Sequence, residues 1–233
     1  MALNKAVFRV RALTAVVFGG VMLAGLFTGL YPFIVLSLII IAGCLYEFLK
    51  IGRRMGKKRS YLYGLLAPIY IVLPVLLLLD LGIQVTGNRE GNAANILYSP
   101  LLPFAVILSI WINDTMAYFV GSLIGKTPFS KISPKKTWEG TIGGILLCIG
   151  IMGSIGSFVP APKPLALQHW IAIAALASIF GTVGDLLESK IKRMAGIKDS
   201  GTFMPGHGGF LDRFDSLLIA TPFVWLYVIL FIR

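Results

Sequence analysis

Charged residues are scarce in this sequence: Asp, Glu, Lys and Arg supply 13% of 233 residues, against about 25% in an average soluble domain. Hydrophobic residues supply 57%, and the mean hydropathy is +0.85. This composition excludes an ordinary water-soluble globule and an intrinsically disordered chain. There are only two cysteines, Cys44 and Cys148, so a disulfide-stapled secreted scaffold is excluded too. Both cysteines lie in apolar segments and are predicted to be small buried residues. A polytopic helical membrane protein remains.

Long apolar segments define the predicted helices. A spanning helix needs about 20 mostly apolar residues, and the charge-free run 12–46 is long enough for two, divided by the turn at Thr28–Pro32. Five more are predicted at 60–79, with kinks at Pro68 and Pro74, and at 91–121, 140–162, 164–184 and 216–232. Their continuous apolarity is unlike the alternation of barrel strands. We therefore predict an all-α polytopic membrane protein of about seven transmembrane helices. Residues 1–95 would hold three spans without a motif. Residues 96–233 would form a catalytic domain of four spans and two loops, 121–140 and 188–213.

Basic residues indicate the orientation. With seven alternating spans, 18 of the 21 Lys and Arg residues fall on one side, and Arg89, Lys163 and Arg233 fall on the other. The positive-inside rule makes the first side cytoplasmic, with the N-terminus inside and the C-terminus outside. The net charge of +11 is then explained by topology and attraction to anionic lipid. We predict a multi-pass protein of the cell membrane, specifically a bacterial inner membrane, with no nucleic-acid partner.

Acidic residues are rarer still, and most lie in or beside the two predicted inner loops. Asp114 lies inside a predicted span and Asp185 near the end of another. A carboxylate at such a depth costs about 2.5 kcal/mol or more unless it is paired or faces a wet cavity. Both a functional site and a buried ion pair are consistent with this pattern. Glu47, at the inner end of the second span, is expected to extend towards nearby basic side chains.

The second inner loop contains the largest number of candidate site residues. From Ser189 to Asp215 it holds five basic residues, three aspartates, His207 and five glycines. Asp212 and Asp215 are three residues apart, so in a helix they share a face. Together with Asp185 they could bind a hard cation through oxygen, with substrate phosphates completing the coordination. The alternative is that these aspartates cap the start of the last helix. A lone His207 is not a zinc site.

The first inner loop, 125–140, contains four lysines beside Ser and Thr hydroxyls and a Ser133-Pro134 turn. Such a loop could line an anionic ligand, although any positive-inside loop looks much the same.

Three segments resemble CDP-diacylglycerol synthases, also called phosphatidate cytidylyltransferases. The segment 189–215 is similar to the family signature at Ser189, Lys192, Arg193, Lys198, Asp199, Gly201, Pro205, His207, Gly208, Gly209, Asp212, Arg213 and Asp215. Asp114–Tyr118 resembles its D-[ST]-G-A-Y motif, and Ser133–Gly140 resembles S-P-x-K-T-W-E-G. Met116 departs from the usual Gly, and Met204 from the usual Leu, Ile or Phe. The likeness covers roughly Trp111 to the C-terminus.

The resemblance implies that CTP and phosphatidate react to give CDP-diacylglycerol and pyrophosphate at the inner face of the bilayer. It implies that the reaction uses Mg²⁺ and a second cation, such as K⁺. It also implies a homodimer. Asp185, Asp212 and Asp215 would bind the metal, and Lys192 and His207 would complete the catalytic set. The expected substrate-binding residues are Asp114, Lys126, Ser133, Lys136, Thr137, Glu139, Ser189, Arg193, Lys198, Asp199, Gly208, Gly209 and Arg213.

Two other functions remain open at this stage. A CTP-dependent lipid kinase would transfer the γ-phosphoryl group and release CDP rather than pyrophosphate. A transporter would place polar residues along a path through several helices, whereas here they gather at one face.

Overall fold

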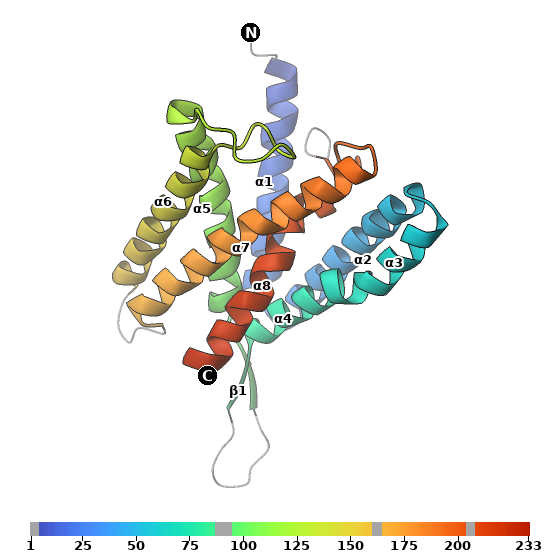
Figure 1. Ribbon diagram of the computed structural model, residues 1–233. Helices are drawn as coiled ribbons and strands as arrows, with labels where there is room; N and C mark the ends of the chain where they lie inside the picture. Colours follow the sequence, from blue (N-terminus) through green and yellow to red (C-terminus); the bar gives the residue numbers. More distant parts are fainter. Residues whose placement is uncertain (1–4, 87–94, 160–164, 204–207) are drawn as a thin grey trace. The chain divides into compact units, whose positions relative to one another are not determined.

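The computed structural model describes residues 5–86, 95–159, 165–203 and 208–233, and helices dominate these ranges (Figure 1). The helices are α1 (Lys5–Phe27), α2 (Leu30–Arg54), α3 (Lys57–Ala67), the π-helix η1 (Pro68–Val72), α4 (Leu73–Gly82), α5 (Leu101–Ile124), α6 (Trp138–Phe158), α7 (Leu167–Met194) and α8 (Leu211–Phe231). Two short strands, β1 (Ile83–Thr86) and β2 (Asn95–Tyr98), pair in antiparallel fashion. The predicted all-α class is confirmed.

Six helical segments in the described part of the chain are long and apolar enough to cross a membrane. They are α2, the continuous run 57–82, α5, α6, α7 and α8. The first predicted segment is helical as α1, and its residues 12–27 form a shorter apolar stretch. The protein is therefore a polytopic helical membrane protein.

The predicted breaks in the N-terminal helices are present. Between α1 and α2, Gly29 has φ 135°, a conformation that favours glycine. The Thr28 hydroxyl donates to the Ala24 carbonyl at 2.6 Å and so occupies an acceptor at the end of α1. The π-helix begins at Pro68, whose missing N–H disrupts the α-helical ladder.

Two predicted boundaries are wrong. The fourth span begins at Leu101 rather than at residue 91, because 95–98 forms β2, rich in residues that favour strands, and Pro100 disfavours helix before it. The second inner loop begins later than residue 188, because α7 continues to Met194. Lys, Arg and Glu are good helix formers, so the charges do not end the helix. It ends just before Gly196, which has φ 69°.

The chain divides into two compact units whose boundary runs through α7 and α8. The first unit combines residues 1–101 with 191–214, and the second combines 102–190 with 215–233. Most of the signature segment thus groups with the N-terminal helices, which carry no motif. Large buried residues form a core in each unit, for example Phe33, Ile40 and Leu78 in the first and Met152, Trp170 and Leu218 in the second. Both cysteines are buried, as predicted.

Glycines let the helices of the second unit approach closely. A Cβ on Gly140 of α6 would lie 2.8 Å from the Ala117 carbonyl oxygen of α5. A Cβ on Gly184 of α7 would lie 2.5 Å from the Asp215 carbonyl oxygen of α8. Small residues at such contacts are typical of helix packing in membranes. Gly140 and Gly184 thus bring helix backbones together at the start of α6 and beside Asp185, where the candidate site lies.

Candidate active site

A cavity of about 440 Å³ lies in the second unit, between α5, the 125–137 loop, the start of α6 and α7. Five residues predicted from the sequence line it: Asp114, Ser133, Lys136, Thr137 and Asp185. The remaining lining residues are Asn113, Ala117, Tyr118, Gly121, Ser122, Lys135, Gly140, Thr141 and Thr182. The cavity therefore gathers side chains from segments up to about 70 positions apart in the chain.

The loop before α6 is held in place by a cap and a carboxylate. The Thr137 hydroxyl oxygen accepts from Gly140 N at 3.1 Å and caps α6. Glu139 accepts from the Thr127 hydroxyl at 2.8 Å and from the backbone N–H groups of Lys126 and Thr127 at 3.2 Å. Glu139 thus fastens the loop to the helix start. Its predicted contact with substrate, and that of the exposed Lys126, stay predictions.

Two of the lining residues form an ion pair. Lys136 Nζ contacts Asp185 Oδ2, and the two side chains are 30% and 25% exposed. The Ser189 hydroxyl, one turn along α7, donates to Asp185 Oδ1 at 3.3 Å. Lys135 and Asp114 also line the cavity and are exposed. Both charges of the pair therefore remain accessible to a ligand.

Three lining residues of the cavity are buried, polar and uncharged, and the sequence analysis did not predict them. Asn113, Thr141 and Thr182 have 3%, 8% and 8% of their surface exposed. Asn113 could have been identified from the sequence, because it directly precedes Asp114 in a segment that is mostly apolar. An amide is costly in a membrane span for the same reason as a carboxylate, although less so.

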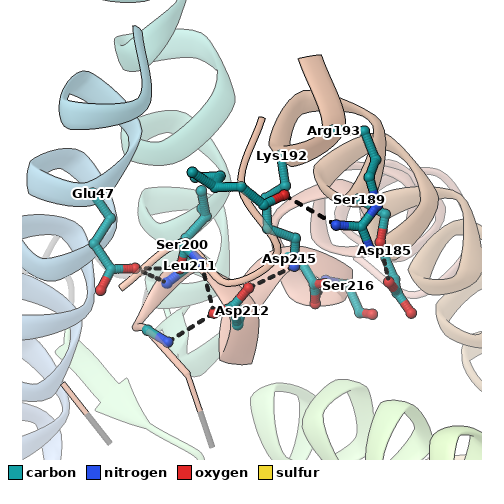
Figure 2. Close-up of polar contacts among 12 residues, drawn as sticks. Glu47, Asp185, Ser189, Lys192, Arg193, Ser200, Leu211, Asp212, Asp215 and Ser216 are labelled. Atoms are coloured by element: carbon teal, nitrogen blue, oxygen red, sulfur yellow. Dashed lines mark hydrogen bonds and ion pairs between the residues drawn. The ribbon is translucent and has the colours of Figure 1, made fainter. Parts of the chain in front are cut away.

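In the first unit, Asp212 forms a second polar group with Glu47, Lys192 and Ser200 (Figure 2). Gly209 also contacts Asp212, and we call these five residues the Asp212 cluster. Asp212 Oδ1 accepts from Lys192 Nζ at 2.6 Å, and Oδ2 accepts from Gly209 N at 2.7 Å and Ser200 N at 3.0 Å. The side chains of Lys192 and Asp212 are only 11% and 8% exposed. Asp212 thereby ties together the end of α7, the following loop and the start of α8. This agrees with the capping alternative for Asp212, whereas its predicted role as a metal ligand stays a prediction.

Glu47 corrects an expectation, because it does not extend towards exposed basic side chains. It is 4% exposed, and its Oε2 accepts from the Ser200 hydroxyl at 2.6 Å and from Leu211 N at 2.9 Å. Gly201 and Gly209 leave room for it, since a Cβ at either position would collide with the carboxylate. These two donors supply the hydrogen bonds that the buried carboxylate of Glu47 would lack among apolar helices. The sequence contains one indication that Glu47 has a structural role: it is the only acidic residue among the first 79.

The other predicted residues are spread over both units. Asp215 is buried in the second unit, and its Oδ1 accepts from Ser216 N at 2.6 Å. Arg193 donates to the Ile197 carbonyl at 3.0 Å. Lys198, Asp199 and Arg213 are exposed, Gly208 has φ 85°, and His207 lies outside the described residues. Within the described ranges, no group of three or more His, Cys, Asp or Glu side chains is arranged to hold a metal ion.

A second cavity, of about 330 Å³, lies in the first unit and differs in kind. It is lined by Val17, Phe18, Ile40, Phe210, Phe214 and other residues that are nearly all apolar. None of the described residues that line it is charged, so they offer no side chain to pair with a phosphate. The cavity of the second unit, which has charged lining residues, is the candidate active site.

Fold and site together define a polytopic membrane protein with a polar, lysine-lined cavity at the ends of its helices. Residues 92–231 match the model of the Cytidylyltransferase family. The chain belongs to that family.

Curated relatives match the chain over about half of its length. The chain is 43% identical to phosphatidate cytidylyltransferase of Bacillus subtilis over 129 residues, which are 55% of this chain and 47% of the relative. It is 43% identical to phosphatidate cytidylyltransferase of Aquifex aeolicus over 52% of this chain and 44% of that protein. It is 42% identical to the chloroplastic phosphatidate cytidylyltransferase 4 of Arabidopsis thaliana over 57% of this chain and 32% of that protein. The matched region spans less than half the length of each of these relatives.

Proposed function

We propose that this protein transfers the cytidylyl group of CTP to phosphatidate, forming CDP-diacylglycerol and pyrophosphate. The observation that carries the proposal is the cavity in which Lys135, Lys136, Asp114 and Asp185 meet beside apolar helices. It combines cations for phosphate with carboxylates for a hard metal, in a protein whose lipid substrate would arrive from the surrounding membrane. Membership of the Cytidylyltransferase family and the names of its relatives favour this reaction.

The charges of the cavity explain why a metal is part of the proposal. Its two lysines and two aspartates cancel formally, so they cannot neutralise a triphosphate. A divalent cation such as Mg²⁺ would supply the missing charge and typically takes one or two carboxylates plus phosphate oxygens. The two carboxylates of the lining, Asp114 and Asp185, would hold it through their oxygens. Asp215 lies on α8 beside Gly184 of α7 but does not line the cavity, so its predicted role as a metal ligand stays a prediction. Asp185 already pairs with a cationic group, Lys136.

In the proposed reaction, a phosphate oxygen of phosphatidate forms a bond to the α-phosphorus of CTP, and the bond from that phosphorus to the bridging oxygen breaks. Pyrophosphate leaves with the electron pair. The nucleophile is already an anion, so no general base is required. Lys135 and Lys136 would hold phosphates, and the hydroxyls of Ser133 and Thr137 would donate to their oxygens. Positioning and charge neutralisation supply the catalysis in such transfers.

We place the site at the cytoplasmic face, where CTP is available. The C-terminal ends of α5 and α7 and the N-terminal starts of α6 and α8 belong to one membrane side if each helix spans once. That side carries the excess of Lys and Arg expected inside. Homodimer formation, a second cation such as K⁺, and the roles of Lys198, Asp199, His207 and Arg213 stay predictions.

The product identifies the reaction. Purified protein in detergent, given phosphatidate, Mg²⁺ and labelled CTP, is expected to form CDP-diacylglycerol and pyrophosphate, and EDTA should stop the reaction. Omitting phosphatidate is the control, and it should abolish pyrophosphate release. Release of CDP with a phosphorylated lipid would instead identify a lipid kinase. No turnover of CTP with any lipid acceptor would contradict both enzymatic readings and favour transport.

A further inference from the structure

Asn113 is an unusual group in the cavity because its side-chain oxygen is buried without a partner. Only 3% of the residue is exposed, and Oδ1 has no hydrogen-bond partner among the described residues. Buried polar atoms are nearly always hydrogen-bonded, and each exception needs an explanation. Asn113 also lines the cavity. An unused acceptor at a cavity wall indicates a ligand that brings a donor.

The lining residues of the cavity differ in burial according to their charge. The polar residues Asn113, Thr141 and Thr182 are buried, whereas both lysines and both aspartates are half-buried or exposed. Thr182 donates its hydroxyl to the Ser178 carbonyl, one turn earlier on α7. The lining therefore combines accessible charged groups suited to phosphate with buried neutral groups suited to a ligand that forms hydrogen bonds without carrying charge.

Of the two proposed substrates, only the nucleotide supplies such a group. Phosphatidate offers ester and phosphate oxygens, which accept hydrogen bonds, and has no donor beyond a phosphate proton. The nucleoside of CTP carries N–H donors on the cytosine 4-amino group and O–H donors on the ribose. We infer that Asn113 Oδ1 accepts a hydrogen bond from the nucleoside of CTP, so that Asn113 belongs to the nucleoside subsite of the cavity. This inference rests on the proposed function.

The test compares Asn113→Leu with Ser109→Ala. Leucine keeps the size of the side chain but removes its polar atoms. Ser109 lies one turn earlier on α5, is fully buried, and already donates to the Ala105 carbonyl at 2.6 Å; it does not line the cavity. We expect Asn113→Leu to raise the KM for CTP about tenfold, as for loss of one buried hydrogen bond. The KM for phosphatidate should stay unchanged, and Ser109→Ala should alter neither.

Nucleotide analogues test the same hydrogen bond on the unaltered protein and separate its two sources. N4,N4-dimethyl-CTP lacks the amino donors, and 2′,3′-dideoxy-CTP lacks the ribose donors. The wild-type protein should discriminate against one of them, and Asn113→Leu should lose that discrimination. If both analogues react as well as CTP, or if Asn113→Leu changes only the KM for phosphatidate, the inference is wrong. A wild-type protein that forms no CDP-diacylglycerol would instead overturn the proposed function, and with it the inference.

Discussion

The two polar groups of this protein contain the same kinds of side chain but differ in how far these are already satisfied. In the Asp212 cluster of the first unit, Asp212 accepts three hydrogen bonds and Glu47 accepts two, and both are almost fully buried. In the cavity of the second unit, Asp185 and Lys136 stay accessible, and Asn113 Oδ1 has no partner among the described residues.

The difference distinguishes polar groups that stabilise the fold from polar groups that are available to a ligand. A carboxylate whose lone pairs are occupied by backbone N–H groups holds a loop in one conformation, because breaking those bonds leaves buried donors unsatisfied. A carboxylate held by a partly exposed lysine and one hydroxyl, as Asp185 is, exchanges these partners for a ligand at lower cost. We therefore assign the Asp212 cluster to the ordering of the signature loop and the cavity to substrate binding.

The largest expected effect is on stability, at Asp212. Replacement of Asp212 by Ala removes the partner of Lys192 in a buried ion pair and should lower the free energy of unfolding by about 3–5 kcal/mol. The measurement is unfolding by SDS titration in mixed micelles. Adding Lys192→Met to this variant should restore part of the stability, because the buried ammonium is then replaced by an apolar side chain of similar length. No loss of stability in Asp212→Ala would contradict the structural assignment.

The next effect is on catalysis, at Asp185. Asp185→Asn should reduce kcat on the order of 10²-fold or more, since loss of one electrostatic contact at a reacting phosphate has effects of this size, and more Mg²⁺ should be needed for half-maximal activity. Stability should change little, because Asp185 is partly exposed. Asp212→Asn is the matched comparison. An equal change in Mg²⁺ dependence there would establish Asp212 as a metal ligand and merge the two groups that we separate.

The smallest effect is expected at Glu47. Glu47→Ala leaves the Ser200 hydroxyl and Leu211 N without their acceptor and should cost about 2 kcal/mol. Glu47→Gln keeps one oxygen that can accept both bonds, so most of this loss should be absent. Proteolysis within 195–210 offers a second measurement, with faster cleavage expected only in Glu47→Ala. Equal cleavage of both variants and the wild type would show that Glu47 does not hold the loop.

Much of the architecture was predictable from local pattern. The break between the first two helices and the interruption at Pro68 follow from turn residues and proline. The place of Asp212 in the first turn of the last helix follows from the preference of carboxylates for helix starts. The error at 188–194 arose because charge was taken as the end of a helix, although Lys and Arg favour helices. The hairpin β1–β2 was missed because four-residue strands beside apolar spans give almost no periodic signal.

The motif residues were also identifiable, but their division into two groups was not. Asp185 and Asp212 carry the same carboxylate group and lie 27 positions apart in the chain, and nothing local separates a satisfied carboxylate from an accessible one. The partners that make the distinction, such as Glu47 for Ser200 and Lys136 for Asp185, lie far away in the chain.

The sequence by itself determined that the chain enters a membrane as apolar helices and that its scarce charges gather near their ends, because both depend on composition and on the length of each apolar run. Only the tertiary structure decided which of these charges are enclosed and which line a cavity. Burial and hydrogen bonding depend on close contacts between helices that glycine permits, and these contacts join residues that are distant in the chain.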